Sequence, residues 1–431
     1  MQYVSTRGGT SPASLSEAIS LGAAPDGGLF VPTRLPKPKA DFTPKEDSLQ
    51  AAARTVLAPF FAGDALESEL QAICSEAFTF ASPLIRLGTR RDFSLQLFHG
   101  PTAAFKDFGA RFLAACLRRL RPQGGRRTVL VATSGDTGSA VAAAFHRTPG
   151  VQVVLLYPDG RVSPRQAHQL GCFGDNVSAL RVAGSFDDCQ RMVKAAFANS
   201  KLREQLHLTS ANSISLGRLL PQMAFHAHAA WTQDGPLNLV IPTGNLGNAL
   251  AAVWAREAGA PIGDIVLATN ANRVLSDFFQ GGEFRPRPSV ATLASAMDVG
   301  DPSNFERLRW TFPGEDALRS RFNAVAVEDE EIEQTIHHGE ARHGQVFCPH
   351  TATAVRVLER LRVAGDQRPW AVVATAHPAK FETVVEPLIG HPVPIPETLA
   401  ALLAQEAHAE PLTPGADSLE SWLLAHSAPA P

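Results

Sequence analysis

The sequence predicts an α/β protein built on parallel sheets with helices on both faces. Four segments show the pattern of an apolar strand followed by a polar turn and a helix: 128–145, 151–160, 237–255 and 369–385. Strands that are apolar throughout and alternate with helices are typical of parallel sheets buried on both faces. The length of 431 residues corresponds to two or three domains at about 150 residues each.

Composition and charge exclude several classes of protein. Hydrophobic residues make up 45% of the chain and charged residues 19%, which is typical of a soluble globular protein. The net charge of -3 provides no basic surface for nucleic acid, and no apolar run is long enough to predict a membrane span. Five widely spaced cysteines and an N-terminus without an apolar signal core favour a reducing, cytoplasmic location.

Three polar turns follow predicted strands, at 133–138, 244–248 and 375–380. Ligands of parallel sheets bind beyond the carboxyl ends of the strands, so these turns are candidate ligand loops. Gly244-Asn245-Leu246-Gly247-Asn248 opens a helix and can cradle a phosphate on its backbone N–H groups, although an ordinary tight turn fits equally well. It lacks the lysine and spacing of a P-loop.

Two further segments could bind an anion. Residues 133–138 (Thr-Ser-Gly-Asp-Thr-Gly) carry hydroxyl donors, with a helix cap formed by Asp136 or Thr137 as the alternative. Residues 212–218 end in Arg218, which suits a phosphate or carboxylate, with a solvated loop as the alternative.

The chain has only seven lysines, and Lys106 is the most unusual of them. It stands at a helix start beside Phe105 and Phe108, where poor solvation would lower its pKa and favour Schiff-base chemistry. The alternative is an extended lysine paired with Asp107. Lys380 competes for the same role, but its proline-led loop predicts a less desolvated amine.

The histidine-rich segment 337–343 predicts a solvated helix and no metal site, because it lacks the H-E-x-x-H arrangement.

Seven motifs in order resemble threonine synthase, a pyridoxal-phosphate (PLP) enzyme of the tryptophan-synthase-β type. The resemblance runs from Tyr3 to about residue 390, and its N-terminal block is similar to the longer subclass of the family. It implies PLP fold type II, with two αβα domains on parallel or mixed sheets and an extra N-terminal region. The motifs are APDGGLFVP (24–32), HGPTAAFKDFG (99–109), ATSGDTGSA (132–140), PTGNLGN (242–248), MDVGDPSNFERL (297–308), CPHTA (348–352) and ATAHPAKF (374–381).

The resemblance also implies roles for individual residues. Lys106 matches the lysine that holds PLP and acts in catalysis, Thr375 the residue facing the pyridine nitrogen, and Asp136 the residue near the ring hydroxyl. The loop for the cofactor phosphate is Gly244, Asn245, Leu246 and Gly247. The pocket for the substrate phosphate is Thr133, Ser134, Thr137, Asn212, Ser213 and Arg218.

The implied reaction converts O-phospho-L-homoserine and water into L-threonine and phosphate. Three alternatives stay open: a PLP-dependent phospholyase that releases 2-oxobutanoate, a nucleotide-binding dehydrogenase using the 133–138 turn, and a non-catalytic phosphate-binding relative. The chain is expected to be a monomer or a weak homodimer that binds neither nucleic acid nor membrane. The expected units are an N-terminal α/β region (1–92), a large PLP-binding domain (93–125 and 210–392), a small mobile domain (126–209) and a C-terminal tail (393–431).

Overall fold

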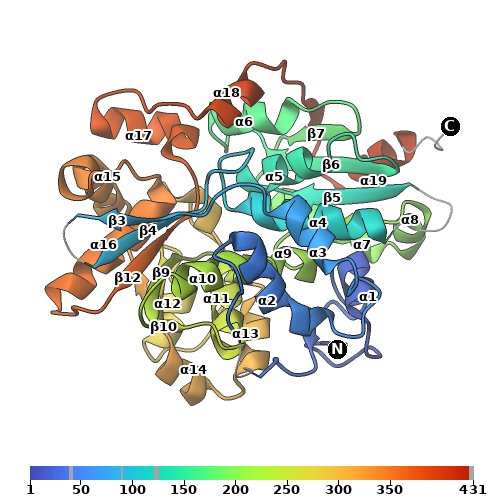
Figure 1. Cartoon of the computed structure of the whole chain (residues 1–431). Coiled ribbons are helices and arrows are strands. Elements are labelled where there is room, and N and C mark those ends of the chain that lie inside the picture. The colour runs from blue at the N-terminus through green and yellow to red at the C-terminus, as the bar shows by residue number, and fades with distance from the viewer. Residues whose placement is uncertain (38–41, 89–90, 121–125, 427–431) are drawn as a thin grey trace.

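Two sheets lie side by side in the computed structural model, which describes residues 1–37, 42–88, 91–120 and 126–426 (Figure 1). The larger sheet has the order β11–β10–β9–β12–β4–β3, and every neighbouring pair is parallel except β4 and β3. Its strands are β3 (Leu84–Leu87), β4 (Asp92–Gln96), β9 (Leu237–Pro242), β10 (Ile262–Thr269), β11 (Asn323–Ala326) and β12 (Trp370–Ala374).

The smaller sheet has the order β13–β7–β6–β5–β8 and is parallel throughout. Its strands are β5 (Arg127–Ala132), β6 (Val151–Pro158), β7 (Val177–Val182), β8 (Thr209–Ser210) and β13 (Glu410–Leu412). Together the two sheets confirm the predicted α/β class with parallel and mixed sheets.

The central strands β5, β6, β9 and β12 are buried along their whole length, as expected of apolar strands covered on both faces of a sheet. In β9, Leu239 and Ile241 join a core cluster with Val129 of β5, while Val240 faces a separate cluster with α15 (Asp329–His343) and α16 (Pro349–Val363). The first of these clusters is continuous from one sheet to the other. The helices around the sheets are α4 (Lys106–Arg119), α5 (Asp136–Phe145), α6 (Pro164–Gly171), α7 (Phe186–Ala198), α8 (Ser200–Gln205), α9 (Leu216–Leu219), α10 (Gln222–Trp231), α11 (Gly247–Glu257), α12 (Val274–Phe279), α13 (Phe305–Thr311), α14 (Glu315–Arg321) and α17 (Glu382–Ile389), with 3-10 turns η1 (Ser295–Met297) and η2 (Pro378–Phe381).

The N-terminal region packs against the helices of the larger domain. An antiparallel pair, β1 (Tyr3–Ser5) and β2 (Phe30–Pro32), is followed by α2 (Leu49–Phe61) and α3 (Leu70–Ala77). The phenol of Tyr3 donates to the carbonyl of Phe60 at 2.8 Å, which ties the strand pair to α2. Helix α1 (Leu15–Leu21) begins with a capping box between Ser14 and Glu17.

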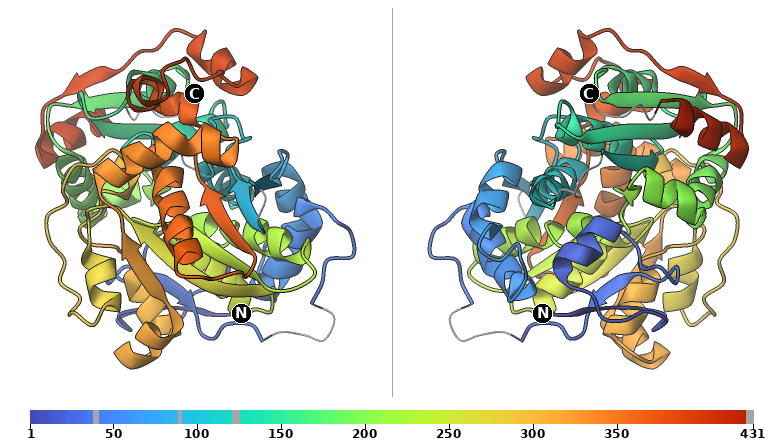
Figure 2. Two further views of the ribbon diagram at one scale, coloured as in Figure 1. Left: turned by 90° about the vertical axis from the view of Figure 1, so that its left-hand side faces the viewer. Right: turned by 90° about the vertical axis from the view of Figure 1, so that its right-hand side faces the viewer.

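The segment 393–431, expected to be a C-terminal tail, is folded over the residues that the structure describes. It contains α18 (Glu397–Leu403), β13 and α19 (Ala416–Ala425), and β13 extends the smaller sheet by pairing with β7. Helix α19 packs on α7 because it buries Leu419, Trp422 and Leu423 (Figure 2). Residues 427–431 lie outside the described part.

Within the described ranges, no helix combines the length and the apolar character needed to cross a membrane.

Candidate active site

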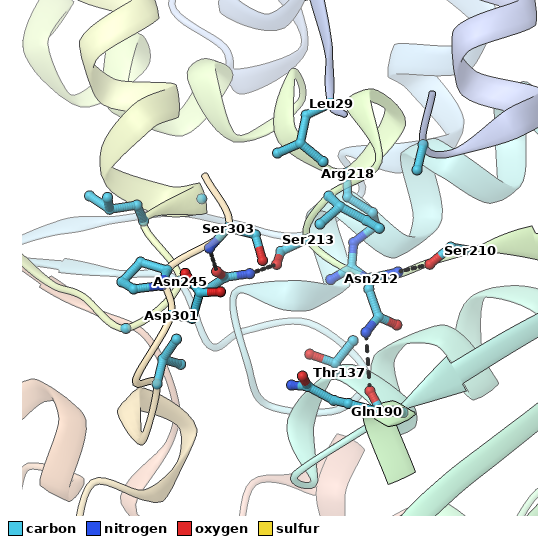
Figure 3. A pocket seen from close by; sticks show the side chains of 18 of the residues that line it. Leu29, Thr137, Gln190, Ser210, Asn212, Ser213, Arg218, Asn245, Asp301 and Ser303 are labelled. Carbon is cyan, nitrogen blue, oxygen red and sulfur yellow. Dashed lines mark hydrogen bonds between the residues drawn. The ribbon is translucent and has the colours of Figure 1, made fainter. Parts of the chain in front are cut away.

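A single cavity of about 2010 Å³ lies beyond the carboxyl ends of β5, β9 and β12. Figure 3 shows part of its lining, with Thr137 reaching in from α5, Arg218 from α9 and Asn245 from the turn before α11. All the predicted site residues line it: Lys106, Thr133, Ser134, Asp136, Thr137, Asn212, Ser213, Arg218, Gly244, Asn245, Leu246, Gly247 and Thr375. The structure thus brings together residues from five separate stretches of the sequence.

The turn between β9 and α11 forms a tight cradle at a helix N-terminus. Leu246 has a positive φ of 61°, which turns the backbone into the first turn of α11. A Cβ on Gly244 would lie 2.7 Å from the Cα of Met297, so the close approach of this segment requires glycine. An 11-residue helix whose free N–H groups open onto the cavity is suited to a phosphate.

Asn245 holds this cradle in place through both ends of its side-chain amide. Its Nδ2 donates to the hydroxyl of Ser213 at 2.7 Å, and its Oδ1 accepts from the backbone N–H of Ser303 at 2.6 Å (Figure 3). The candidate anion loops at 244–248 and 212–218 are therefore joined directly by a hydrogen bond.

The loop at 133–138 uses one of its hydroxyls internally. Thr133 Oγ1 accepts from the backbone N–H groups of Gly135 at 3.0 Å and Gly138 at 2.9 Å, and Thr133 is almost fully buried. In the structure the Thr133 hydroxyl therefore shapes the loop. A contact between Thr133 and a substrate phosphate stays a prediction. Ser134 and Thr137 line the cavity from the same loop.

Arg218 is a buried cation, and one of its hydrogen-bond donors has no partner among the described residues. Its residue is 4% exposed, and its Nη1 donates to the carbonyl of Ala211 at 2.6 Å. Its Nε, like the hydroxyl of Ser215, has no hydrogen-bond partner among the described residues. Burial lowers the pKa of Arg218 to about 10, and an anion would compensate this buried charge.

Lys106 begins α4 and faces the cavity with 15% of its side chain exposed. Its Nζ lies 3.7 Å from Asp136 Oδ2, so its partner is Asp136 and not Asp107. Burial lowers the pKa of Lys106, with Asp136 opposing the shift and Lys380 and Arg218 adding to it. The neutral amine that Schiff-base chemistry needs is therefore favoured.

Asp107 points away into the protein. Its carboxylate accepts from the hydroxyl of Thr102 at 2.6 Å and from the backbone N–H of Thr102 at 2.9 Å. Phe108 and Phe112 of α4 also turn inward and pack against Phe78 in the core. Lys106 is desolvated by its position at the base of the cavity and has only the Phe105 ring close by, 5.7 Å from Nζ.

The expectation that Lys380 is poorly desolvated is wrong. The residue is completely buried, and its Nζ contacts Asp136 Oδ1 at 2.8 Å and donates to the carbonyl of Thr102 at 2.7 Å. Its turn, η2, folds beneath the start of α4, which a local sequence pattern does not reveal. Two features of the sequence point to Lys380, namely the scarcity of lysine and its place in the motif ATAHPAKF.

Thr375 follows β12 and sits next to the start of α4. Its carbonyl accepts from the backbone N–H of Phe105 at 2.8 Å, and Ala103 accepts from His377 at 3.0 Å. These backbone contacts fix the hydroxyl of Thr375 and the amine of Lys106 on the same wall of the cavity.

Three buried residues near the site were given no role from the sequence. Asn304 donates to the carbonyl of Asn245 at 2.9 Å, and Arg307 donates to Asn304 Oδ1 at 2.8 Å. His350 Nε2 accepts from the backbone N–H of Ala296 at 3.0 Å, and burial lowers its pKa to about 4. Two of the recognised motifs contain these residues, which is the only sequence signal for them.

The histidine-rich helix α15 uses its imidazoles in ordinary contacts. His337 Nδ1 donates to the carbonyl of Leu388 at 2.7 Å, and His343 lies 3.2 Å from Glu359. In the part of the chain that the structure covers, no three histidine, cysteine or acidic residues are grouped so that they could hold a metal ion.

Three family models match the chain in succession. "Threonine synthase N terminus" matches residues 2–78, "Pyridoxal-phosphate dependent enzyme" matches 86–379, and "Threonine synthase, C-terminal" matches 351–422. Together they reach from the strand pair at the N-terminus to α19.

Curated relatives agree with these models. The threonine synthase of Serratia marcescens is 38% identical over 394 residues, which cover 90% of each chain. The threonine synthase of Escherichia coli K12 is 37% identical over 398 residues, which cover 90% of this chain and 91% of the relative.

Solved structures extend the similarity to the whole chain. The crystal structure of threonine synthase from Escherichia coli has a TM-score of 0.90 at 32% identity and covers 99% of this chain and all of that one. The PLP-bound threonine synthase from Brucella melitensis has a TM-score of 0.90 at 33% identity, with 99% of both chains covered. The chain described here therefore belongs to the threonine synthase family of pyridoxal-phosphate-dependent enzymes.

Proposed function

We propose that this protein converts O-phospho-L-homoserine and water into L-threonine and phosphate, with PLP as its cofactor. The observation that carries the proposal is that candidate anion loops for two phosphates, 244–247 for one and 133–138 with 212–218 for the other, line the same cavity as the desolvated Lys106. A reaction in which cofactor and substrate both carry phosphate needs two such loops. A dehydrogenase that binds a nucleotide at 133–138 would leave the cradle at 244–247 unexplained.

The residues present fit PLP. Lys106 would form the Schiff base, the cradle of Gly244, Asn245, Leu246 and Gly247 would hold the cofactor phosphate, and Asp136 would lie near the ring hydroxyl. Thr375 would face the pyridine nitrogen with a hydroxyl, which does not stabilise a proton there as a carboxylate would. When bound, PLP acidifies the substrate Cα and stores the electrons released from it.

The chain's own groups then bind the substrate and move its protons. Ser134, Thr137, Asn212, Ser213 and Arg218 would bind the substrate phosphate, with Thr133 shaping their loop. Lys106 Nζ, as the neutral amine, would remove the proton at Cα and return it at the end of the cycle. Because a leaving γ-phosphate gains charge, Arg218 and the hydroxyl donors would stabilise its departure.

The phospholyase alternative differs only in the fate of the intermediate after phosphate leaves. The test is to incubate the purified holoenzyme with O-phospho-L-homoserine and to measure phosphate, L-threonine and 2-oxobutanoate together. We expect threonine and phosphate in equal amounts. Phosphate released with equal 2-oxobutanoate would identify a phospholyase, and PLP binding without phosphate release would identify a non-catalytic relative.

The association state is the remaining part of the proposal. We propose a monomer or a weak homodimer, as the resemblance to the longer subclass of the family implies. Sedimentation velocity of the holoenzyme over a hundredfold range of concentration tests this, and a stable larger assembly would contradict it.

A further inference from the structure

Two amines and one carboxylate meet in the wall of the cavity. Asp136 Oδ1 lies 2.8 Å from Lys380 Nζ, and its Oδ2 lies 3.7 Å from Lys106 Nζ. Lys380 is completely buried and Asp136 is 3% exposed, so neither charge is solvated by water. In such surroundings a second positive charge without its own counter-ion is costly.

We propose that Lys380 is a positioning residue whose ammonium neutralises Asp136 and keeps Lys106 uncharged. The proposal deepens the proposed function and rests on it in one respect, namely that Lys106 is the reactive amine. It assigns to Lys380 no contact with the reacting atoms.

The geometry decides which of the two amines carries the charge. Lys380 Nζ has a carboxylate oxygen at 2.8 Å and the carbonyl of Thr102 at 2.7 Å, both within the range of strong charge-assisted hydrogen bonds. Lys106 Nζ makes a longer contact, 3.7 Å, with the other oxygen of Asp136, and its remaining neighbour among the described residues is the face of the Phe105 ring. The ammonium is therefore better accommodated on Lys380.

The backbone around Lys380 is fixed from the smaller sheet. Ser163, the N-cap of α6, donates its hydroxyl to the carbonyl of Lys380 at 2.7 Å, and Arg165 donates to the carbonyl of Ala379 at 2.6 Å. Gln166 Nε2 donates to Asp136 Oδ1 at 3.0 Å, so one helix turn orients both members of the ion pair. These hydrogen bonds fix the positions of Lys380 and Asp136 relative to each other.

Among the residues that the structure describes, the charged groups around the pair provide no further counter-ion for Lys106. From α9, Arg218 adds a positive charge, and burial keeps His350 of α16 neutral. Asp107 of α4 is the other carboxylate nearby, and both of its oxygens accept from Thr102. Burial outweighs these hydrogen bonds and raises the pKa of Asp107, which weakens it further as a counter-ion.

The direction of the Lys106 and Asp136 titrations agrees with this assignment. Burial lowers the pKa of Lys106, and Lys380 and Arg218 lower it more while Asp136 opposes them. Burial would raise the pKa of Asp136, but Lys380 and Lys106 together hold it well below its usual range.

The test measures the protonation of Lys106 directly in the full chain freed of PLP. Acetic anhydride reacts only with neutral amines, and mass spectrometry of the peptide containing Lys106 gives its labelling rate from pH 6 to 10. In Lys380→Met, Asp136 would pair with Lys106 instead, so we expect labelling of Lys106 at pH 7.5 to fall about tenfold or more. Lys380→Arg should restore it, and the exposed Lys201→Met should leave it unchanged. An unchanged labelling rate in Lys380→Met would overturn the proposal.

A second comparison covers the case in which Lys380→Met does not fold. Asp136→Asn and Asp136→Asn/Lys380→Met both lack the carboxylate, and the double variant buries no unpaired charge there. Lys106 should be labelled more slowly in the double variant than in Asp136→Asn, because the repelling ammonium is gone. Equal rates in the two variants would also overturn the proposal.

Failure of the proposed function would look different. Borohydride reduction of the PLP-loaded wild type, followed by peptide mapping, should place the cofactor on Lys106. If the reduced cofactor is found on Lys380 instead, the assignment of the Schiff base is wrong. That conclusion does not depend on the acetylation rates measured in the cofactor-free chain.

Discussion

At the scale of single residues, the site depends on charges that water does not screen. Arg218 and Lys106 are both buried in the wall of one cavity, and their pKa values are lowered for that reason. Arg218 keeps an unpartnered donor while Lys106 favours its neutral form. The first is suited to hold an anion, and the second is suited to accept a proton or to form a covalent bond.

Replacing Lys106 by alanine should abolish both covalent cofactor binding and turnover. The variant lacks the amine that forms the Schiff base and the base at Cα, so kcat should fall by more than about 10³-fold. Absorbance of the bound cofactor in the visible range and threonine formation are the measurements, with Lys201→Ala as the control. Visible absorbance that survives in Lys106→Ala would move the Schiff base to another lysine.

Replacing Arg218 by alanine should weaken substrate binding while PLP stays bound. Loss of charge-assisted hydrogen bonds to the substrate phosphate should raise KM for O-phospho-L-homoserine by about 10–100-fold. Arg147→Ala provides a control at an exposed arginine. Loss of PLP from Arg218→Ala would show that the two anion loops have been assigned the wrong way round.

At the scale of elements, the site is built from strand ends and the helices that follow them. The sequence predicts this arrangement well at β5–α5 and β9–α11, where a long apolar run meets a glycine turn. It does not predict β8, which has two residues, or β13, whose pairing with β7 depends on a contact between distant parts of the chain.

The cradle before α11 allows a sharp test of this element. In Gly244→Ala the new Cβ would lie 2.7 Å from the Cα of Met297, so the backbone must shift and the N–H groups move out of place. We expect the dissociation constant of PLP to rise by about tenfold or more, measured by titration of the cofactor-free protein. Gly235→Ala is a matched control, because a Cβ there meets nothing within 4 Å. Equal PLP affinity in the two variants would mean that the cradle does not hold the cofactor.

At the scale of the whole molecule, neutral buried histidines link stability to pH. The pKa of both His226 and His350 is lowered by burial to about 4 from an ordinary value of 6.5. The unfolded chain therefore binds protons between pH 6.5 and 4 that the folded chain does not, so stability is lost as the pH falls through this window.

The free energy of unfolding should consequently fall between pH 7 and pH 5, by about 2 kcal/mol for each of the two histidines. Urea unfolding of the cofactor-free chain at both pH values measures it. His226→Gln should show a smaller loss over the same interval than the wild type. An equal loss in both would show that His226 titrates normally in the folded protein.

Features set by neighbouring residues in the sequence could be predicted, whereas those set by packing between distant segments could not. The fold class and the set of cavity residues could be predicted, because each loop lies directly after a strand whose pattern is clear. The burial of Lys380 could not, since it depends on how η2 packs beneath α4 and beside α6. The inward direction of Asp107, likewise, is set by its contacts with Thr102.

The place of β13 has one more consequence. Because residues 410–412 complete the edge of the smaller sheet and α19 packs on α7, the N-terminal strand pair and α19 belong to different halves of the molecule. A donor fluorophore on the strand pair and an acceptor on α19 would therefore report any hinge between the halves as a change in energy transfer. Removing the last forty residues, by contrast, would expose β7 as a bare edge open to aggregation.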